Sequence, residues 1–477
     1  MSGPAPTPEA PQLRPRLTFF DLTNITVGSI VGADIYVASA ITAGILGPAS
    51  LVAWVVAGML AATLALVLAS CAGFVPRVGG PYAYVAAAFG PFPGFVAGWA
   101  MWAAEVIALP VFAISFTNYL AYFVDLGEPA QIAVRGGFLA LLTGVNVAGV
   151  KAAGRLNDVL TIAKLTPLLL LVVIGGGYLA THAEVARAHY LPFAPHGIEG
   201  FRAALLLIFW AYAGFELTTI PAAEVQEPRR TIPRALITGM AIVTLFYLAT
   251  NAVVYGMVPW QELSQTSTPL ILVGTALVGG VGAWVMAGGA LISVSGSDES
   301  DMLASARRSY AMALDGLLPR PLARLHPRFE TPHVALILQG IVAFGLSMSS
   351  RIPHLITFAV FNLSLTFLLS SLALWRLSRD EHDGFRQPLA PVLAVVGVAI
   401  TVFLIASSKP LDILVGLGVT GAGVLVYAAF APRRPHEDVA VLESPALLVH
   451  HATARQERFL GHWLLLIRGA LRRVRGG

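Results

Sequence analysis

The 477-residue chain is poor in charged residues, which make up 12% of it, whereas hydrophobic residues make up 56%. A soluble globular chain carries about 25% charged residues. The composition therefore excludes an ordinary soluble domain and predicts a bundle of membrane-spanning helices. The net charge of +4 comes mostly from loops and the C-terminal segment, so no nucleic-acid partner is expected.

Cysteine and the signatures of catalytic sites are also scarce. Cys71 is the one cysteine and lies in an apolar stretch, so a disulfide within the chain is excluded. The histidines show no metal-ligand spacing, and no nucleophile–base pair or phosphate-binding loop stands at a plausible strand–helix junction. We therefore expect no enzyme activity, no cofactor and no metal site. Residues 1–16 are proline-rich and lack a secretory cleavage pattern.

Long apolar runs are what the chain has instead. A membrane-crossing helix needs about 20 residues. Twelve runs are long enough: 19–46, 48–74, 92–124, 130–149, 156–180, 201–222, 235–258, 270–303, 333–350, 354–376, 388–407 and 410–431. The runs 92–124 and 270–303 are longer than the others and predict strongly tilted helices. The predicted fold class is an all-α membrane protein with about 12 transmembrane helices.

Basic residues lie almost entirely on one side of these runs. A cytoplasmic N-terminus puts 24 of the 30 Lys and Arg residues on the cytoplasmic side and 5 on the outer side. Cytoplasmic loops of membrane proteins carry such an excess, so we expect both termini in the cytoplasm and the protein in the cell (inner) membrane. Residues 1–16 are then a cytoplasmic segment. The tail, residues 432–477, has the pattern of a basic amphipathic helix on the inner leaflet, with a helix packed on the bundle or a disordered tail as alternatives.

Two runs are interrupted by small and polar residues at matching places. The interruptions are residues 28–36 in the run 19–46 and residues 209–216 in the run 201–222. Non-helical backbone at membrane depth is tolerated only where it is buried in protein or lines a cavity. Paired broken helices in two halves of a chain indicate the substrate site of a transporter. Because these runs are the first and the sixth, we expect an inverted five-plus-five repeat.

Four motifs occur in a characteristic order. They are GADIY at residues 32–36, PRVGGPY at 76–82, FE at 215–216 with EVQEPRRTIP at 224–233, and DGLLP at 315–319 with TP at 331–332. In this order they resemble the motifs of the amino acid–polyamine–organocation (APC) superfamily of secondary transporters, in its amino acid permease branch. The resemblance implies the LeuT-type fold in a transporter domain at 17–431. Its inverted repeats would be about 17–180 and 200–378, with the last two spans outside them.

The resemblance also implies that an amino acid or amine binds between the half-helix ends at the two breaks. A half-helix N-terminus presents unpaired N–H groups with a partial positive charge, and a C-terminus presents unpaired carbonyls. The N–H groups expected to face a carboxylate belong to Gly32, Ala33 and Asp34. The carbonyls expected to face an ammonium belong to Ile30, Trp210 and Ala213. Trp210 is expected to be a gate or pocket wall, or else an ordinary packed aromatic.

Three acidic residues inside the runs bear on the substrate. Asp34 stands where the family usually has Gly, so it either caps the outer half-helix or binds a cationic group or a proton. The resemblance implies that Glu105 and Asp301 face the substrate side chain. Because an unpaired buried carboxylate is costly, these acids favour a cationic substrate such as Lys, Arg, ornithine or a polyamine. The alternative is a neutral amino acid, with acids that are protonated or directed elsewhere.

Among the basic residues, Lys164 lies deepest inside a run. The resemblance implies that its ammonium stands where sodium binds in sodium-coupled relatives, with Ser297 as its contact in the eighth span. The alternative is a lysine that snorkels to the cytoplasmic surface. Glu216, after the second break, is expected either to take part in proton movement or to brace the break. Two further acids are expected to pair with Arg307 or Lys164, namely Asp298 and Glu299.

These residues together predict a secondary active transporter for amino acids or related amines that works by alternating access. It is expected to be sodium-independent, with proton coupling or exchange, and to lean toward cationic substrates. A sodium-coupled carrier of neutral amino acids on the same fold and a non-transporting amino acid sensor are the alternatives. The expected partners are the small-molecule substrate and the lipid bilayer.

Overall fold

The computed structural model describes residues 17–76, 79–149, 153–219, 225–348, 351–379 and 387–431. Within these ranges the regular elements are helices, and one isolated parallel bridge joins Leu17 to Val225. The N-terminal segment 1–16 and the predicted amphipathic helix of the tail lie outside the described residues.

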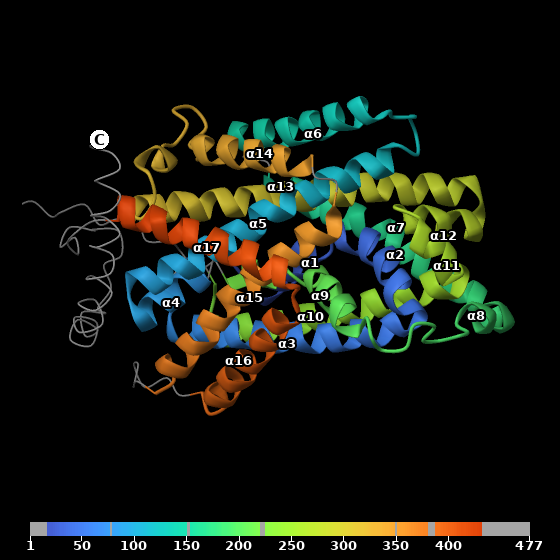
Figure 1. Ribbon diagram of the computed structural model, residues 1–477, viewed down its shortest axis with the longest axis horizontal. Coiled ribbons are helices and arrows are strands. Elements are labelled where there is room, and N and C mark those ends of the chain that lie inside the picture. Colours follow the sequence, from blue (N-terminus) through green and yellow to red (C-terminus); the bar gives the residue numbers. More distant parts are fainter. Residues whose placement is uncertain are drawn as a thin grey trace, which may run out of the picture.

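The helices lie side by side in an elongated bundle (Figure 1). The first half holds α1 (Phe19–Ile30), α2 (Asp34–Leu46), the 3₁₀ turn η1 (Gly47–Ala49), α3 (Ser50–Phe74), α4 (Pro81–Phe89), α5 (Pro91–Leu120), α6 (Glu128–Ala148), α7 (Ala153–Thr181) and α8 (Ala183–His189). The second half holds α9 (Phe201–Ala211), η2 (Phe215–Thr219), α10 (Pro228–Met257), α11 (Trp260–Gln265), α12 (Pro269–Val278), α13 (Gly280–Leu314), η4 (Arg320–Ala323), α14 (His333–Ser347), α15 (Ile352–Leu377), α16 (Ala390–Ser407) and α17 (Pro410–Phe430).

The twelve predicted apolar runs each coincide with a helix or with a pair of helices. In the described ranges, nine helical segments are long and apolar enough to cross a membrane, the first of them holding both α2 and α3. One expectation is wrong: the run 270–303 is not a single tilted helix but α12 and α13, which pack against each other. Gly279 separates them with φ of 65°, a left-handed conformation that glycine adopts without steric cost.

Both predicted breaks are present. In the first span, α1 ends at Ile30, Val31 is extended with φ −75° and ψ 105°, and α2 begins at Asp34. In the sixth span, α9 ends at Ala211, and the 3₁₀ turn η2 begins after Gly214, whose φ is 114°. The two breaks therefore place non-helical backbone inside the bundle.

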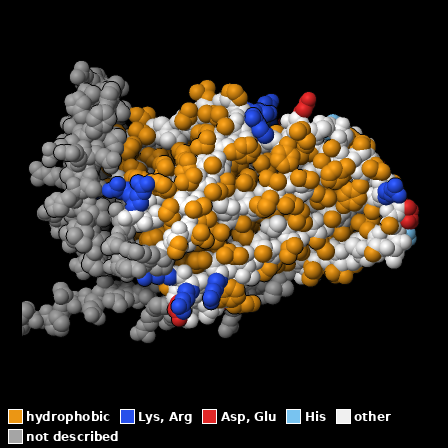
Figure 2. Space-filling view, turned by 90° about the horizontal axis from the view of Figure 1, so that it is seen from below, with side chains coloured by type: hydrophobic (Ala, Val, Ile, Leu, Met, Phe, Trp, Pro, Cys, Tyr) orange, Lys and Arg blue, Asp and Glu red, His pale blue; other side chains and the backbone are white. Residues whose placement is uncertain are grey.

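The helix α5 forms the centre of the bundle. It is apolar on all sides, as a buried helix must be, and 83% of its most apolar window is buried. It packs against α13, α15 and α4. By contrast, only 17% of the corresponding window of α17 and 28% of that of α6 are buried. Figure 2 shows one face covered mainly by hydrophobic side chains, with Lys and Arg near its margins, which is the surface a bilayer requires.

Candidate functional site

A cavity of about 40 Å³ lies where the two breaks meet. A cavity needs about 10–15 Å³ to hold one water, so this one has room for only a few water molecules. Its walls come from both breaks and from α5, α13 and α15. The lining residues are Ser29, Ile30, Asp34, Ala104, Glu105, Ala108, Phe112, Trp210, Ala213, Gly214, Glu216, Ser297, Asp301, Ala359 and Leu363.

Most residues predicted from the sequence gather at this cavity. Eight of them line it: Ile30, Asp34, Glu105, Trp210, Ala213, Glu216, Ser297 and Asp301. The exceptions are Gly32 and Ala33, which are not among its lining residues, and Lys164, which lies behind Ser297. The sequence analysis missed the contribution of α15, Ala359 and Leu363, because small and aliphatic residues in an apolar run carry no local signal.

Asp34 is the first residue of α2, and Ala33 holds the N-cap position. Of the two alternatives for Asp34, the N-cap is therefore wrong, and the binding of a cationic group or a proton stays a prediction. Its side chain is 5% exposed, and Oδ2 accepts a hydrogen bond of 2.5 Å from the hydroxyl of Tyr247 on α10. That hydroxyl also lies 3.1 Å from the carbonyl oxygen of Ile30. Tyr247 thus joins the two half-helices of the first span.

Lys164 contacts the first break directly. Its Nζ donates to the carbonyl of Gly28 at 2.5 Å and to Ser297 Oγ at 3.5 Å. The side chain is 4% exposed, so it does not snorkel to the surface. Ser297 Oγ lies 3.4 Å from the carbonyl of Val31, and Ser293 Oγ lies 3.5 Å from that of Gly32. Side chains from α7 and α13 therefore donate hydrogen bonds to the carbonyls that the break leaves without helical partners.

The second break is closed by its own residues. The Gly214 N–H donates to Glu216 Oε2 at 2.9 Å, and the Gly214 carbonyl accepts from Ser29 Oγ at 3.0 Å. Glu216 therefore braces this break, as one of its two expected roles requires. Trp210 is 5% exposed, and its ring centroid lies 6.1 Å from that of Phe112, so the two rings form one wall of the cavity.

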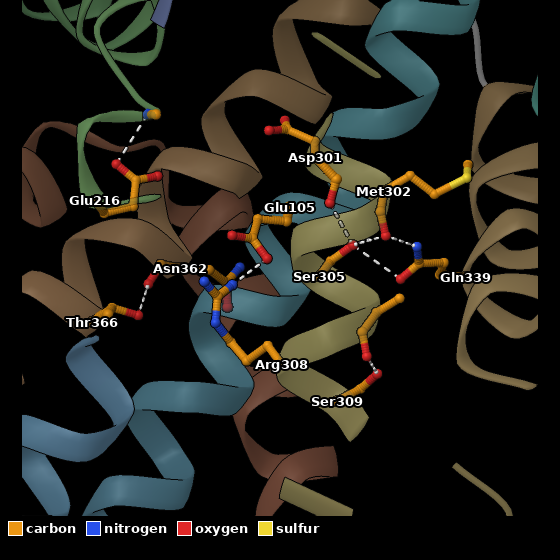
Figure 3. Close-up of polar contacts among 12 residues, drawn as sticks. Glu105, Glu216, Asp301, Met302, Ser305, Arg308, Ser309, Gln339, Asn362 and Thr366 are labelled. Carbon is orange, nitrogen blue, oxygen red and sulfur yellow. Dashed lines mark hydrogen bonds and ion pairs between the residues drawn. The ribbon is translucent and has the colours of Figure 1, made fainter. Parts of the chain in front are cut away.

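Glu105 forms a buried ion pair that the sequence analysis missed. Figure 3 shows its carboxylate on α5 and the guanidinium of Arg308 on α13 pointing toward one another, joined through Oε2 and Nη1. Asp301 lies seven residues before Arg308, which puts both on one face of α13. That two-turn spacing was the signal in the sequence that could have placed Arg308 near the site. It is hidden by the adjacent, exposed Arg307, which makes both arginines look like ordinary cytoplasmic charges.

The expected pairing of Asp298 and Glu299 is wrong. Asp298 is fully buried, and neither of its carboxylate oxygens has a hydrogen-bond partner among the described residues. Glu299 is attracted by the charge of Arg307, but no ion pair joins the two within the described ranges. Lys164 is directed to Gly28 and Ser297 instead, because the break supplies carbonyls at that position.

Comparison with known proteins gives one consistent result. Residues 17–430 match the model of the family described as amino acid permease. The chain is 28% identical to the methylthioribose transporter of Bacillus subtilis, over 87% of this chain and 93% of that protein. It is 26% identical to the branched-chain amino acid permease of Bacillus subtilis, over 88% and 93% of the two chains. It is also 26% identical to the serine/threonine exchanger of that organism, over 87% and 96%.

Proposed function

Because the chain belongs to the amino acid permease family, we propose that it is a sodium-independent permease for amino acids or related amines that works by alternating access. The class follows from the family: the protein is a multi-pass membrane transporter of a small molecule and not an enzyme. The fold is the all-α, LeuT-type fold of that family, with an inverted five-plus-five repeat in which spans 1 and 6 are broken.

Sodium independence is supported by the position of Lys164. Its ammonium bridges the carbonyl of Gly28 on α1 and the hydroxyl of Ser297 on α13. A fixed cation at this place supplies the charge that a bound sodium ion would supply. Proton coupling fits such a site, because Lys164 and the buried acids are groups that can gain or lose a proton, and exchange is the alternative mode.

Recognition of an amino acid is supported by the backbone at the breaks. The start of α2, at Gly32, Ala33 and Asp34, presents helix N–H groups and a partial positive charge suited to a carboxylate. The carbonyls of Trp210 and Ala213 lie at and just beyond the end of α9. The Trp210 carbonyl accepts the N–H of Ala213 at 2.9 Å and keeps a second lone pair for an ammonium. A zwitterion matches this pair of ends. Gly32 and Ala33 lie outside the lining of this small cavity, so the site must widen when a substrate enters.

One observation supports the proposed preference for cationic substrates. Three carboxylates line the cavity without an ion pair in the described part of the chain: Asp34, Glu216 and Asp301. Lys164 attracts Asp34 and Asp301 electrostatically but bonds to neither. Burying uncompensated charge costs several kcal/mol per ion, so a second positive charge on the substrate stabilises the loaded site. The three relatives described above are named for methylthioribose, branched-chain amino acids, and serine and threonine.

Uptake into proteoliposomes tests the class of coupling. We expect radiolabelled substrate to enter at the same rate in sodium and in choline buffer. A pH gradient or internal unlabelled substrate should stimulate uptake, which separates proton coupling from exchange. Uptake that requires sodium would favour the sodium-coupled carrier, and saturable binding without uptake would favour the sensor.

A competition panel tests the substrate. Alanine, leucine, lysine, arginine and putrescine are added to the purified protein, and thermal stabilisation is measured. We expect lysine, arginine or putrescine to stabilise the protein more than leucine does. Stabilisation by alanine or leucine alone would make the cationic preference wrong and leave the transporter class unchanged.

The proposed placement puts both termini in the cytoplasm and the protein in the cell membrane. The charge distribution of the sequence supports this orientation. The proposed domain limits are residues 17–431, flanked by a cytoplasmic segment and a tail that lie outside the described residues.

A further inference from the structure

Arg308 places a guanidinium beside the acidic wall of the cavity. Its side chain is 5% exposed, and that of its partner Glu105 is 7% exposed, so the pair is cut off from water. Its positive charge also attracts Glu216 and Asp301. A basic group of the protein itself therefore stands among the carboxylates to which the second positive charge of a substrate would be drawn.

Each partner of the ion pair leaves one polar atom without a hydrogen bond in the described part of the chain. Glu105 Oε1 and Arg308 Nη2 are buried and have no hydrogen-bond partner in the described ranges. Glu105 lines the cavity, whereas Arg308 is not among its lining residues. A buried polar atom without a partner costs about 1–3 kcal/mol, so a donor that reaches Oε1 when the site widens would stabilise Glu105. Its other oxygen is held by Arg308.

We propose that Arg308 is a specificity-determining residue that acts as a tethered counter-cation. It neutralises Glu105 and so limits the positive charge that a substrate can bring to this end of the cavity. This inference rests on the proposed function, because it concerns the same cavity. With Arg308 in place, three cavity carboxylates lack an ion pair. Without it, Glu105 becomes a fourth, and a substrate ammonium is the group that restores the balance of charge.

This role differs measurably from a structural one. A residue that merely holds α5 to α13 would, when replaced, weaken the binding of every ligand alike. Removing a counter-cation would change the ranking of ligands by charge, because it would raise the affinity for cationic ligands and leave the affinity for neutral ligands unchanged. The ratio of two affinities in one variant therefore separates the roles, since a general loss of stability cancels from the ratio.

The test measures dissociation constants of leucine, lysine and putrescine by thermal-shift titration for the wild type, Arg308→Met and Arg307→Met. Methionine keeps much of the apolar stem and removes the charge. Arg307→Met is the matched control, because it removes the same charge from the neighbouring, exposed position. We expect Arg308→Met to increase the preference for lysine or putrescine over leucine at least tenfold. Arg307→Met should leave the preference within twofold of the wild type.

Two more variants keep the test decisive if Arg308→Met does not fold. Glu105→Gln leaves the guanidinium without its counter-charge and should lower the preference for cations at least fivefold. The double variant Glu105→Gln/Arg308→Met removes both charges and should return the preference to within threefold of the wild type. The proposal is overturned if folded Arg308→Met keeps the wild-type preference, or if Glu105→Gln increases the preference for cations.

The same titrations separate this proposal from the proposed function. A wild type that binds leucine but neither lysine nor putrescine contradicts the cationic preference of the site. In that case Arg308→Met should still create measurable putrescine binding, because it frees a carboxylate that the wild type keeps paired. Absence of that gain in the folded variant would overturn the role of Arg308 independently.

Discussion

The two broken spans both leave backbone groups without helical partners but satisfy them in different ways. The first break is held from outside, by Lys164 on α7, Ser293 and Ser297 on α13 and Tyr247 on α10. The second break is closed by the hydrogen bond from the Gly214 N–H to Glu216. It contacts the first span through the hydrogen bond that Ser29 donates to the Gly214 carbonyl. Three other helices therefore fix the geometry of the first break, whereas local conformation fixes that of the second.

The difference has a mechanical consequence. A change in the position of α7, α10 or α13 alters the partners of the first break, so this break can respond to movement elsewhere in the bundle. The second break keeps its own bond in any such movement and depends on a glycine conformation. Substitutions should therefore separate the two: those at the second break affect folding, and those around the first affect binding and transport.

The largest effect is expected for Gly214→Ala. The φ of Gly214 is 114°, and an added Cβ would lie 2.6 Å from the backbone oxygen of Ser29, which cannot rotate away. The conformation alone costs about 1–3 kcal/mol in a residue other than glycine. We expect a large fall in folded yield and melting temperature, measured by size-exclusion chromatography and thermal shift, and a loss of uptake.

Gly32→Ala is the matched substitution at the first break. There an added Cβ would lie 2.8 Å from Ser297 Oγ and 2.9 Å from Asp34 Oδ1, which are side-chain atoms that can move. We expect a melting temperature close to that of the wild type and weaker binding, and Gly32→Leu should abolish binding more than it lowers stability. Equal losses of stability and binding at Gly32 would show that it is a packing glycine and would remove the contrast between the breaks.

Lys164→Ala should give the next largest effect. It removes the cation that bridges Gly28 and Ser297 and so removes one of the links between the first break and α13. We expect uptake to fall at least tenfold while the purified protein stays folded and monodisperse. Normal uptake by Lys164→Ala, or a requirement of the wild type for sodium, would contradict the assigned role.

The breaks and Lys164 could be predicted because their signals are local. Glycine and polar residues inside an apolar run, and a single lysine among hydrophobic neighbours, are visible without knowing what packs against them. The division of the run 270–303 was missed although Gly279 and Gly280 interrupt it, because a glycine pair also lies inside the unbroken helix α6, at Gly136 and Gly137. Local composition therefore located the site but not every helix end.

The partners of the site could not be predicted, because they depend on which helix faces lie together. Arg308 is adjacent to Arg307 in the sequence, yet one is buried against α5 and the other is exposed. Tyr247 looks like any aromatic in a membrane span until α10 is placed beside α1. Such pairings are set by tertiary packing, and a single sequence carries no separate signal for them.

Tyr247→Phe should show a moderate effect that is confined to the first break. The substitution leaves the carboxylate of Asp34 and the carbonyl of Ile30 without the hydroxyl. Hydrogen bonds to charged groups contribute about 1.5–3 kcal/mol, so we expect substrate affinity to fall roughly tenfold or more. Tyr255→Phe is the control on the same helix, since its hydroxyl lies 3.1 Å from the carbonyl of Ser39, farther along α2. An equal loss of affinity in both variants would show that the effect comes from α10 as a whole.

The smallest effect is expected at a contact that touches neither break. At the C-terminal end of α13, Asp315 Oδ2 accepts a hydrogen bond of 2.5 Å from the hydroxyl of Tyr82 on α4. Burial raises the pKa of the Asp315 carboxyl above its ordinary value, although the bond from Tyr82 opposes this. The folded state therefore binds the proton more tightly than the unfolded state does. The contribution to stability is largest below about pH 4, the ordinary pKa of Asp, and is lost as the pH rises through the raised value.

Asp315→Asn should remove this dependence, because an amide does not titrate and its oxygen can still accept from Tyr82. The melting temperature of the variant, measured from pH 4 to pH 8, should rise relative to that of the wild type by a few degrees at most. Substrate affinity should stay unchanged, because Asp315 lines neither break. A relative fall in the melting temperature with rising pH would contradict the sign of the pKa shift. A change in affinity would show that the C-terminal end of α13 transmits its state to the first break, which would extend the set of outside contacts that hold that break in place.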